Sequence, residues 1–203
     1  MAFGKPARCF LIGALAFLPP FDSGAFALEI TPADEEKLGA GEVVAQVSPD
    51  PAGTAASVSA AIDIQASPEA VWSVMVDCAR APKFVPDLKS CRVLQSDPQG
   101  AWDVREHMID WAWFLPTIRN VFRSEYERPH RLTFHRVDGD LKESDGEWRL
   151  EPRNNGSATR VFYTARLAPN GWIPTSWVED NLRRDIPKVL TALRRECSPI
   201  APR

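Results

Sequence analysis

The chain has 203 residues, of which 44% are hydrophobic and 25% charged, and its formal net charge is −3. This balance argues against a nucleic-acid partner, because phosphate binding needs a clustered surplus of Lys and Arg. The length fits one domain with a substantial core. Beyond the N-terminal segment, no apolar run reaches the roughly 18 residues that a membrane-spanning helix needs.

Residues 1–27 have the pattern of a secretory signal peptide. Lys5 and Arg8 form a basic start, the apolar stretch after them is too short to span a bilayer, and residues 25–27 (Ala-Phe-Ala) match a cleavage motif. We predict cleavage after this motif and export to the periplasm. An uncleaved N-terminal anchor is the alternative. Cleavage would also remove Asp22 and change the net charge from −3 to −4.

Residues 28–54 are interpreted as a peripheral N-terminal arm. Thr31 is a suitable N-cap for a short helix, with Pro32 at its first position and acidic residues in its first turn. Residues 42–47 favour a strand, and residues 48–53 have the composition of a turn-rich linker.

The domain proper is predicted to span residues 55–197, with a short tail at 198–203. It opens with an alternating run at 56–64 that is typical of a strand. Ser67 then caps a helix that has Pro at its first position. A short second helical turn is expected over residues 79–86.

Alternating side chains predict six further strands, at residues 88–96, 102–111, 118–126, 131–137, 146–151 and 158–167. Consecutive strands with short connections favour an antiparallel sheet, and Asn154-Asn-Gly is a hairpin signal between the last two. In the 102–111 strand, Arg105, His107, Ile109 and Trp111 share one face. The sequence leaves open which face of each strand points inward.

The last predicted element is a long amphipathic helix over residues 175–195. Its apolar residues recur every three or four positions, at Val178, Leu182, Ile186, Val189 and Leu193. We expect this stripe to face the sheet. Ser176 and Glu179 have the spacing of a capping box, and Pro187 should bend the helix.

Three cysteines follow the N-terminal segment, and export favours disulfide formation. Cys78 and Cys91 are separated by a short loop and form the natural pair, which would stabilise the fold by about 3 kcal/mol. Two buried free thiols are the alternative. Cys197 would stay free or pair between molecules. No metal site is predicted, because the chain has no Cys-x-x-Cys and no close His/Cys cluster.

Three segments carry a resemblance to the START-like (SRPBCC) superfamily, which includes polyketide cyclase/dehydrase and coenzyme Q-binding domains. They are residues 64–77 (Ile-x-Ala-Ser-Pro-Glu-Ala-Val-Trp-x-Val-x-x-Asp), 84–88 (Phe-Val-Pro-Asp-Leu) and 186–193 (Ile-Pro-Lys-Val-Leu-x-x-Leu). The resemblance covers roughly residues 55–197. It implies an α+β helix-grip fold, in which a curved antiparallel sheet wraps a long C-terminal helix around an apolar cavity. The signal peptide and the arm look most like exported bacterial members.

The predicted ligand-binding residues are mainly aromatic. Trp111, Trp113 and Phe114 precede Pro116, and Trp177 enters the last helix, so we expect these two segments to flank a cavity mouth. The predicted cavity walls come from later strands and the helix, at Phe122, Phe134, Trp148, Tyr163, Leu182 and Ile186. Ordinary core packing is the alternative, because aromatic side chains commonly fill cores.

No catalytic residue is predicted. Glu106 and His107 are neighbours in one strand and point to opposite faces, so they cannot form a dyad. The sequence holds no Gly-x-Ser-x-Gly, phosphate loop or His-Glu-x-x-His. A cavity with a converging Arg, Tyr and His would nevertheless favour an enzyme. An inward Arg105 or Arg123 would suggest a partner for a ligand carboxylate or phosphate.

These features together predict an exported carrier for a hydrophobic small molecule such as a lipid, quinone or isoprenoid, without a cofactor. Transient contact with a membrane surface is a further expectation. Two alternatives remain. One is a cyclase- or dehydratase-like enzyme acting in the same cavity. The other is an envelope protein with a collapsed cavity, which binds a protein partner through residues 28–54.

Overall fold

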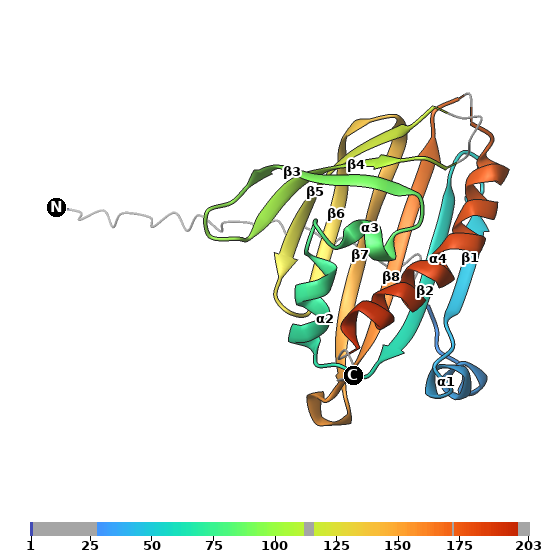
Figure 1. Cartoon of the computed structure of the whole chain (residues 1–203). Coiled ribbons are helices and arrows are strands. Elements are labelled where there is room, and N and C mark those ends of the chain that lie inside the picture. The colour runs from blue at the N-terminus through green and yellow to red at the C-terminus, as the bar shows by residue number, and fades with distance from the viewer. Residues whose placement is uncertain (2–27, 112–115, 172, 199–203) are drawn as a thin grey trace.

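Figure 1 shows the computed structural model, which describes Met1 and residues 28–111, 116–171 and 173–198. Its helices are α1 (Pro32–Gly39), α2 (Pro68–Met75), α3 (Ala81–Phe84) and α4 (Thr175–Cys197), with a 3₁₀ turn at Asn154–Gly156. The strands are β1 (Val44–Pro49), β2 (Ala56–Ile64), β3 (Leu88–Ser96), β4 (Trp102–Ile109), β5 (Ile118–Glu127), β6 (Arg131–Gly139), β7 (Leu141–Arg153) and β8 (Ala158–Pro169). No helix in these ranges is long and apolar enough to cross a membrane.

All eight strands form one sheet in the order β1-β2-β8-β7-β6-β5-β4-β3, and every neighbouring pair is antiparallel. The sheet is strongly curved, and α2, α3 and α4 lie on its concave side (Figure 1). This arrangement confirms the α+β helix-grip fold. The hairpin expected at Asn154-Asn-Gly joins β7 to β8.

The long helix α4 packs mainly over β1, β2 and β8, at one end of the sheet. The inner face of β2 is formed by side chains that are at most 1% exposed, and Ala56 and Ala60 are among them. Small alanine side chains let a helix approach a sheet closely. The predicted apolar stripe of α4 is buried here, including Val178, Leu190 and Leu193.

Residues of the N-terminal arm are joined to the domain at the edge strand β1 and on the outer face of β2. Leu38 of α1 is 1% exposed and packs with Val44 and Ala61 in a second, small apolar cluster. Arg160 of β8 is buried and donates hydrogen bonds to Asp63 (2.7 Å) and to Glu35 of α1 (2.5 Å). The arm is therefore held by apolar packing and by ion pairs.

Several local predictions differ from the structure. Strand β1 covers Val44–Pro49 instead of residues 42–47, and β4 ends at Ile109 instead of residue 111. Strand β7 begins at Leu141 instead of residue 146, because Leu141 and Ser144 are buried within a segment whose other side chains are polar. The capping box at Ser176 and Glu179 is wrong: α4 begins at Thr175, Pro174 is its N-cap, and no side chain caps it. Ser176 therefore lies inside the first turn. The helix continues through Pro187.

Cys78 and Cys91 form the disulfide expected from the sequence, with their Cα atoms 5.4 Å apart. Cys78 lies between α2 and α3, and Cys91 lies on β3. The bond therefore ties the two short helices to the edge strand. Cys197, at the end of α4, is a free and half-buried thiol.

Candidate functional site

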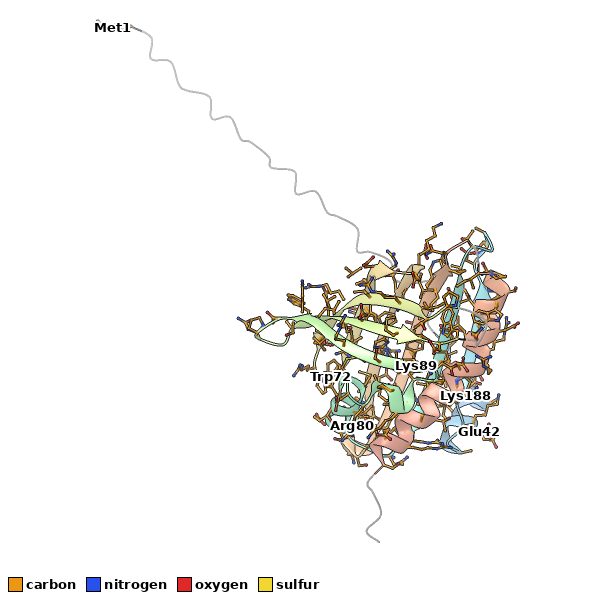
Figure 2. The ribbon with its side chains drawn as sticks, turned by 45° about the horizontal axis from the view of Figure 1, so that its top comes forward. Met1, Glu42, Trp72, Arg80, Lys89 and Lys188 are labelled. Carbon is orange, nitrogen blue, oxygen red and sulfur yellow. A yellow bond between two sulfur atoms is a disulfide. The ribbon has the colours of Figure 1, made fainter. Side chains whose placement is uncertain are left out.

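A cavity of about 220 Å³ lies between the concave face of the sheet and the helices α3 and α4. Strands β4 to β8 form its floor, because α4 covers the sheet mainly at the β1, β2 and β8 end. In Figure 2, Trp72, Arg80 and Lys89 mark the segment from α2 to β3, and Lys188 marks α4. Helix α3 of that segment packs against α4 and contributes Ala81 and Phe84 to the cavity lining.

The cavity brings together most of the predicted ligand-binding residues. Seven of them line it: Trp111, Phe122, Phe134, Trp148, Tyr163, Leu182 and Ile186. Trp177 lies just outside the lining and contacts Trp111, with ring centroids 5.5 Å apart. Trp113 and Phe114 lie outside the described residues. Arg105, His107 and Ile109 on one face of β4 and Trp111, two residues beyond its end, all line the cavity.

The aromatic side chains form a connected wall. The ring centroids of Phe122 and Phe134 are 5.8 Å apart, those of Phe134 and Tyr163 are 6.3 Å apart, and those of Trp148 and Tyr163 are 4.4 Å apart. These separations are in the range in which aromatic pairs attract each other beyond simple apolar burial. The wall is therefore a continuous apolar surface of the cavity.

Gly146 of β7 makes room for Phe134 in this wall. The two residues are register partners across β6 and β7, and a Cβ atom at position 146 would collide with the Thr164 carbonyl oxygen of β8 and lie 2.6 Å from Phe134 Cζ. Any larger residue at 146 would therefore displace the Phe134 ring or the β8 backbone. The sequence analysis did not identify this role.

Arg105 was one of two arginines expected to bind a ligand carboxylate or phosphate if it pointed inward. It does line the cavity, but its hydrogen bonds are made to other groups of the protein. Its guanidinium donates to Asp103 (3.0 and 2.5 Å), to the Tyr126 hydroxyl (2.8 Å) and to the Val76 carbonyl (3.1 Å). Arg123, the other candidate, lies over the Trp102 ring and pairs with Glu125. Both guanidinium groups therefore already have partners within the protein, and neither is free to pair with an anionic ligand.

His107 is a polar residue of the cavity floor whose Nε2 atom is buried and has no hydrogen-bond partner. Burial lowers its pKa to about 4, and the positive charge of Arg105 contributes to this shift. The imidazole is therefore neutral at neutral pH. Its ring meets Phe122 edge-on, with centroids 4.8 Å apart.

Asn120 of β5 is the register partner of His107 on β4. Its Nδ2 donates to Ser144 Oγ of β7 (3.0 Å), whereas its Oδ1 is buried without a partner. Asn120 is 7% exposed and lines the cavity together with Ser144. His107, Asn120 and Ser144 thus form a polar corner in an otherwise largely apolar floor.

The other charged lining residue, Asp185 of α4, is neutralised by neighbours outside the cavity. Burial opposes its ionisation, but hydrogen bonds from Arg184 and Lys188 outweigh that effect and keep the Asp185 pKa below its usual value. Asn181 on the same helix donates to the Trp177 carbonyl (2.7 Å) and accepts from Arg184. Each of these polar groups already has partners within the protein.

Sequence reasoning missed the polar corner. The signal was present for His107, which alternates with Arg105, Ile109 and Trp111 on one strand face, but a single His in a strand is usually a surface or satisfied group. Asn120 and Ser144 come from strands that pair with others and not with each other, so only the folded sheet shows that their side chains meet. In the described ranges no group of His, Cys, Asp or Glu side chains could hold a metal ion.

Comparison with solved structures finds the same fold in proteins of low sequence identity. A STAR-related lipid transfer protein from Xanthomonas axonopodis superposes with a TM-score of 0.65 at 18% identity, covering 76% of this chain and 93% of that one. An aromatase/cyclase from Streptomyces sp. R1128 superposes with a TM-score of 0.61 at 16% identity, covering 70% of this chain and 93% of that one. The lipid transfer and protein localization domain of human StarD13 superposes with a TM-score of 0.64 at 13% identity, covering 78% of this chain and 86% of that one.

At the sequence level, no curated protein matches the chain. Residues 64–194 match the family model described as polyketide cyclase / dehydrase and lipid transport. This range runs from the end of β2 almost to the end of α4 and includes all the residues of the cavity. A match over most of the chain, together with the helix-grip fold around the cavity, places this protein in the polyketide cyclase / dehydrase and lipid transport family of START-like domains.

Proposed function

We propose that this protein binds a hydrophobic small molecule in the cavity and serves as its carrier. The observation that supports this most is the connected aromatic wall around an unfilled space of about 220 Å³. Burial of apolar ligand surface there would supply roughly 25 cal/mol per Å². The unfilled space also argues against the alternative of a collapsed cavity.

The size of the cavity bears on the kind of ligand. A dry apolar cavity of about 150 Å³ holds benzene, so this one fits a compound with one or two rings, or part of a single chain, without rearrangement. A lipid with two acyl chains would require α3 and α4 to move apart. Among the lipids, quinones and isoprenoids expected from the sequence, a quinone or isoprenoid fits the observed space better.

Native mass spectrometry of the full-length gene product, purified from the cells that make it, tests this proposal. We expect the wild type to carry a small apolar molecule at near-unit stoichiometry, which extraction would identify. Leu182→Trp fills the cavity and should abolish co-purification. Leu94→Trp makes the same exchange at an exposed position of β3 and should keep it. A ligand-free mass in all three proteins would contradict the carrier function.

Export and a contact with a membrane surface belong to the same proposal. The N-terminal pattern of residues 1–27 supports export, and a carrier of apolar ligands must collect them from a membrane or another protein. The mass of the purified protein tests the first point, because cleavage after Ala27 leaves a chain that begins at Leu28. A chain that retains residues 1–27 would support the membrane-anchor alternative.

A cyclase- or dehydratase-like activity is a second candidate, and one observation favours it. Arg105, His107 and Tyr163 all line the cavity, which is the convergence that an enzyme would need. Arg105 is occupied by Asp103 and Tyr126, however, and a pKa of about 4 makes His107 a weak base. A linear poly-β-ketone thioester should therefore form ring-closed product no faster with the wild type than with His107→Leu. Faster ring closure with the wild type would establish the enzymatic function.

A further inference from the structure

The polar corner formed by His107, Asn120 and Ser144 lies against the aromatic wall. Strands β4 and β5 place His107 opposite Asn120, and Ser144 of β7 accepts a hydrogen bond from Asn120 Nδ2. The His107 ring contacts Phe122, which belongs to the wall. A ligand lying on the wall therefore has one end beside this corner.

Two atoms of the corner lack the hydrogen bonds that buried polar atoms normally make. His107 Nε2 and Asn120 Oδ1 are both buried, and neither has a hydrogen-bond partner among the residues that the structure describes. More than nine-tenths of buried polar groups have a partner in native proteins, and leaving one unpaired costs free energy. These two atoms lie on register partners that both line the cavity, so one bound polar group could satisfy both of them.

The charges around the cavity limit what that group can be. Arg105 is paired with Asp103, and Asp185 is paired with Arg184 and Lys188, so the lining offers no unpaired charge to an ionised head group. An anion would also meet the Asn120 carbonyl oxygen, which repels it. A neutral group that donates one hydrogen bond and accepts another satisfies both buried atoms.

We propose that the ligand ends in an uncharged hydroxyl, of a phenol, quinol or isoprenoid-type alcohol, and that His107 and Asn120 bind this hydroxyl. This inference rests on the proposed carrier function and names its ligand class. The hydroxyl donates to Asn120 Oδ1 and accepts from His107 Nε2–H, because a neutral imidazole can carry its proton there. Both acceptor and donor are buried in the wall, so we expect the imidazole and the amide to turn toward the ligand.

Three naphthalene probes of matched shape test the hydroxyl preference in the wild-type protein. The uncharged two-ring fluorophore 1-naphthylamine reports occupancy of the cavity, and 2-naphthol, 2-methylnaphthalene and 2-naphthoate compete with it near neutral pH. We expect 2-naphthol to bind about tenfold more tightly than 2-methylnaphthalene, which corresponds to the net free energy of one to two hydrogen bonds. The ionised 2-naphthoate should bind more weakly than either.

Two variants then assign the preference to the polar corner. His107→Leu and Asn120→Leu should each reduce the ratio of 2-methylnaphthalene to 2-naphthol dissociation constants toward one, while 2-methylnaphthalene itself binds within about threefold of wild type, since its contacts are apolar. His135→Leu is the matched control, because His135 lies on β6 and is 62% exposed. It should keep the tenfold ratio.

The outcomes separate this inference from the carrier function. Tight binding of the fluorophore and of both neutral probes without a preference would overturn the hydroxyl site and leave the carrier function intact. Tighter binding of 2-naphthoate than of 2-naphthol would also overturn it, in favour of a carboxylate held by Arg105. Failure of the folded wild type to bind the fluorophore or any probe would overturn both proposals. Even if a variant does not fold, the ratio of the 2-methylnaphthalene to 2-naphthol dissociation constants of the wild type shows whether the cavity prefers a hydroxyl.

Discussion

His107 shows at the residue scale how one side chain connects the stability of this protein with its site. Its ring lies against Phe122 of the aromatic wall, and burial together with the charge of Arg105 lowers its pKa to about 4. The protein keeps a neutral imidazole at the cavity, where an apolar residue would pack without an unmet hydrogen bond. Under the proposal above, the hydroxyl of the ligand supplies this missing hydrogen bond.

The lowered pKa makes the stability dependent on pH in a defined direction. The unfolded chain takes up a proton on His107 near pH 6.5 and the folded protein only near pH 4, so the stabilisation is complete above pH 6.5 and is lost as the pH falls to about 4. The wild type should lose about 2 kcal/mol more than His107→Leu between pH 7.5 and pH 5. Urea unfolding at both pH values measures this difference.

Leu94→Ala serves as the control for this measurement, because it removes no titratable group and lies at an exposed position of β3. Its unfolding free energy should follow the wild-type pH profile. Equal pH profiles for wild type and His107→Leu would show that the His107 imidazole is accessible to protons in the folded state.

At the scale of elements, the N-terminal arm is the part whose role changes most between sequence and structure. Its strand β1 is the edge of the sheet, and its helix α1 covers the outer face of β2. Arg160 is held between Glu35 and Asp63, and Arg194 of α4 donates to the Gly41 carbonyl. An arm with these contacts is poorly suited to leave the domain for a protein partner.

Leu38→Ala tests whether α1 is an integral element. Leu38 is 1% exposed in the outer cluster, so its truncation should destabilise the protein by about 3 kcal/mol in urea unfolding. Leu94→Ala, at a position that is 39% exposed, should change the stability by less than about 0.5 kcal/mol. An unaffected Leu38→Ala variant would mean that the arm does not contribute to the folded core and would revive the partner-binding alternative.

The disulfide also holds elements together, because it attaches the α2–α3 segment to β3 beside the cavity. The bond closes a loop with a sequence separation of 13 residues, and removing it should cost about 3 kcal/mol in the chain-entropy model. We expect this loss for the double variant Cys78→Ser/Cys91→Ser. Cys197→Ser leaves the bridge in place and should stay within about 0.5 kcal/mol of wild type. If both proteins melt like wild type, the bridge has no stabilising role.

At the scale of the whole molecule, the position of α4 decides where the cavity is. The helix is pressed against β1, β2 and β8, where alanines allow close approach, and the curved sheet continues beyond it to β3. Large aromatic side chains line the remaining space without filling it. The cavity thus results from uneven packing of one helix on one sheet.

A bound ligand should therefore stabilise the whole fold. With free 1-naphthylamine at ten times its dissociation constant, the free energy of unfolding should rise by about 1.4 kcal/mol. For a chain of this size the melting temperature should increase by roughly 3–6 °C. Differential scanning calorimetry measures the shift. The probe should not change the melting temperature of Leu182→Trp, and it should raise that of Leu94→Trp as much as that of the wild type. An increase in both variants would place the probe outside the cavity.

Local patterns in the sequence were sufficient to predict most of the helices and strands. The Ser67 cap, the alternating runs from β2 to β8 and the apolar stripe of α4 are each encoded within one segment, because capping and periodicity are properties of neighbouring residues. The helix-grip fold was implied by the resemblance of residues 64–77, 84–88 and 186–193 to START-like domains, and the aromatic residues of the strands were then the expected cavity lining. The pairing of Cys78 with Cys91 followed from their short separation.

Only the tertiary structure decided how the inner face is used. Which strand face points inward depends on pairing and on the packing of α4, and this brought His107, Asn120 and Ser144 from three strands into one corner. Gly146 was assigned by the Phe134 ring that occupies its missing side chain, and Arg105 was removed from the ligand-binding candidates by its bonds to Asp103 and Tyr126. The sequence by itself determined where the helices and strands lie and which of their positions are apolar or polar, since these are local properties. Contacts between residues far apart in the chain, which determine the site, exist only once the sheet has closed around the helix.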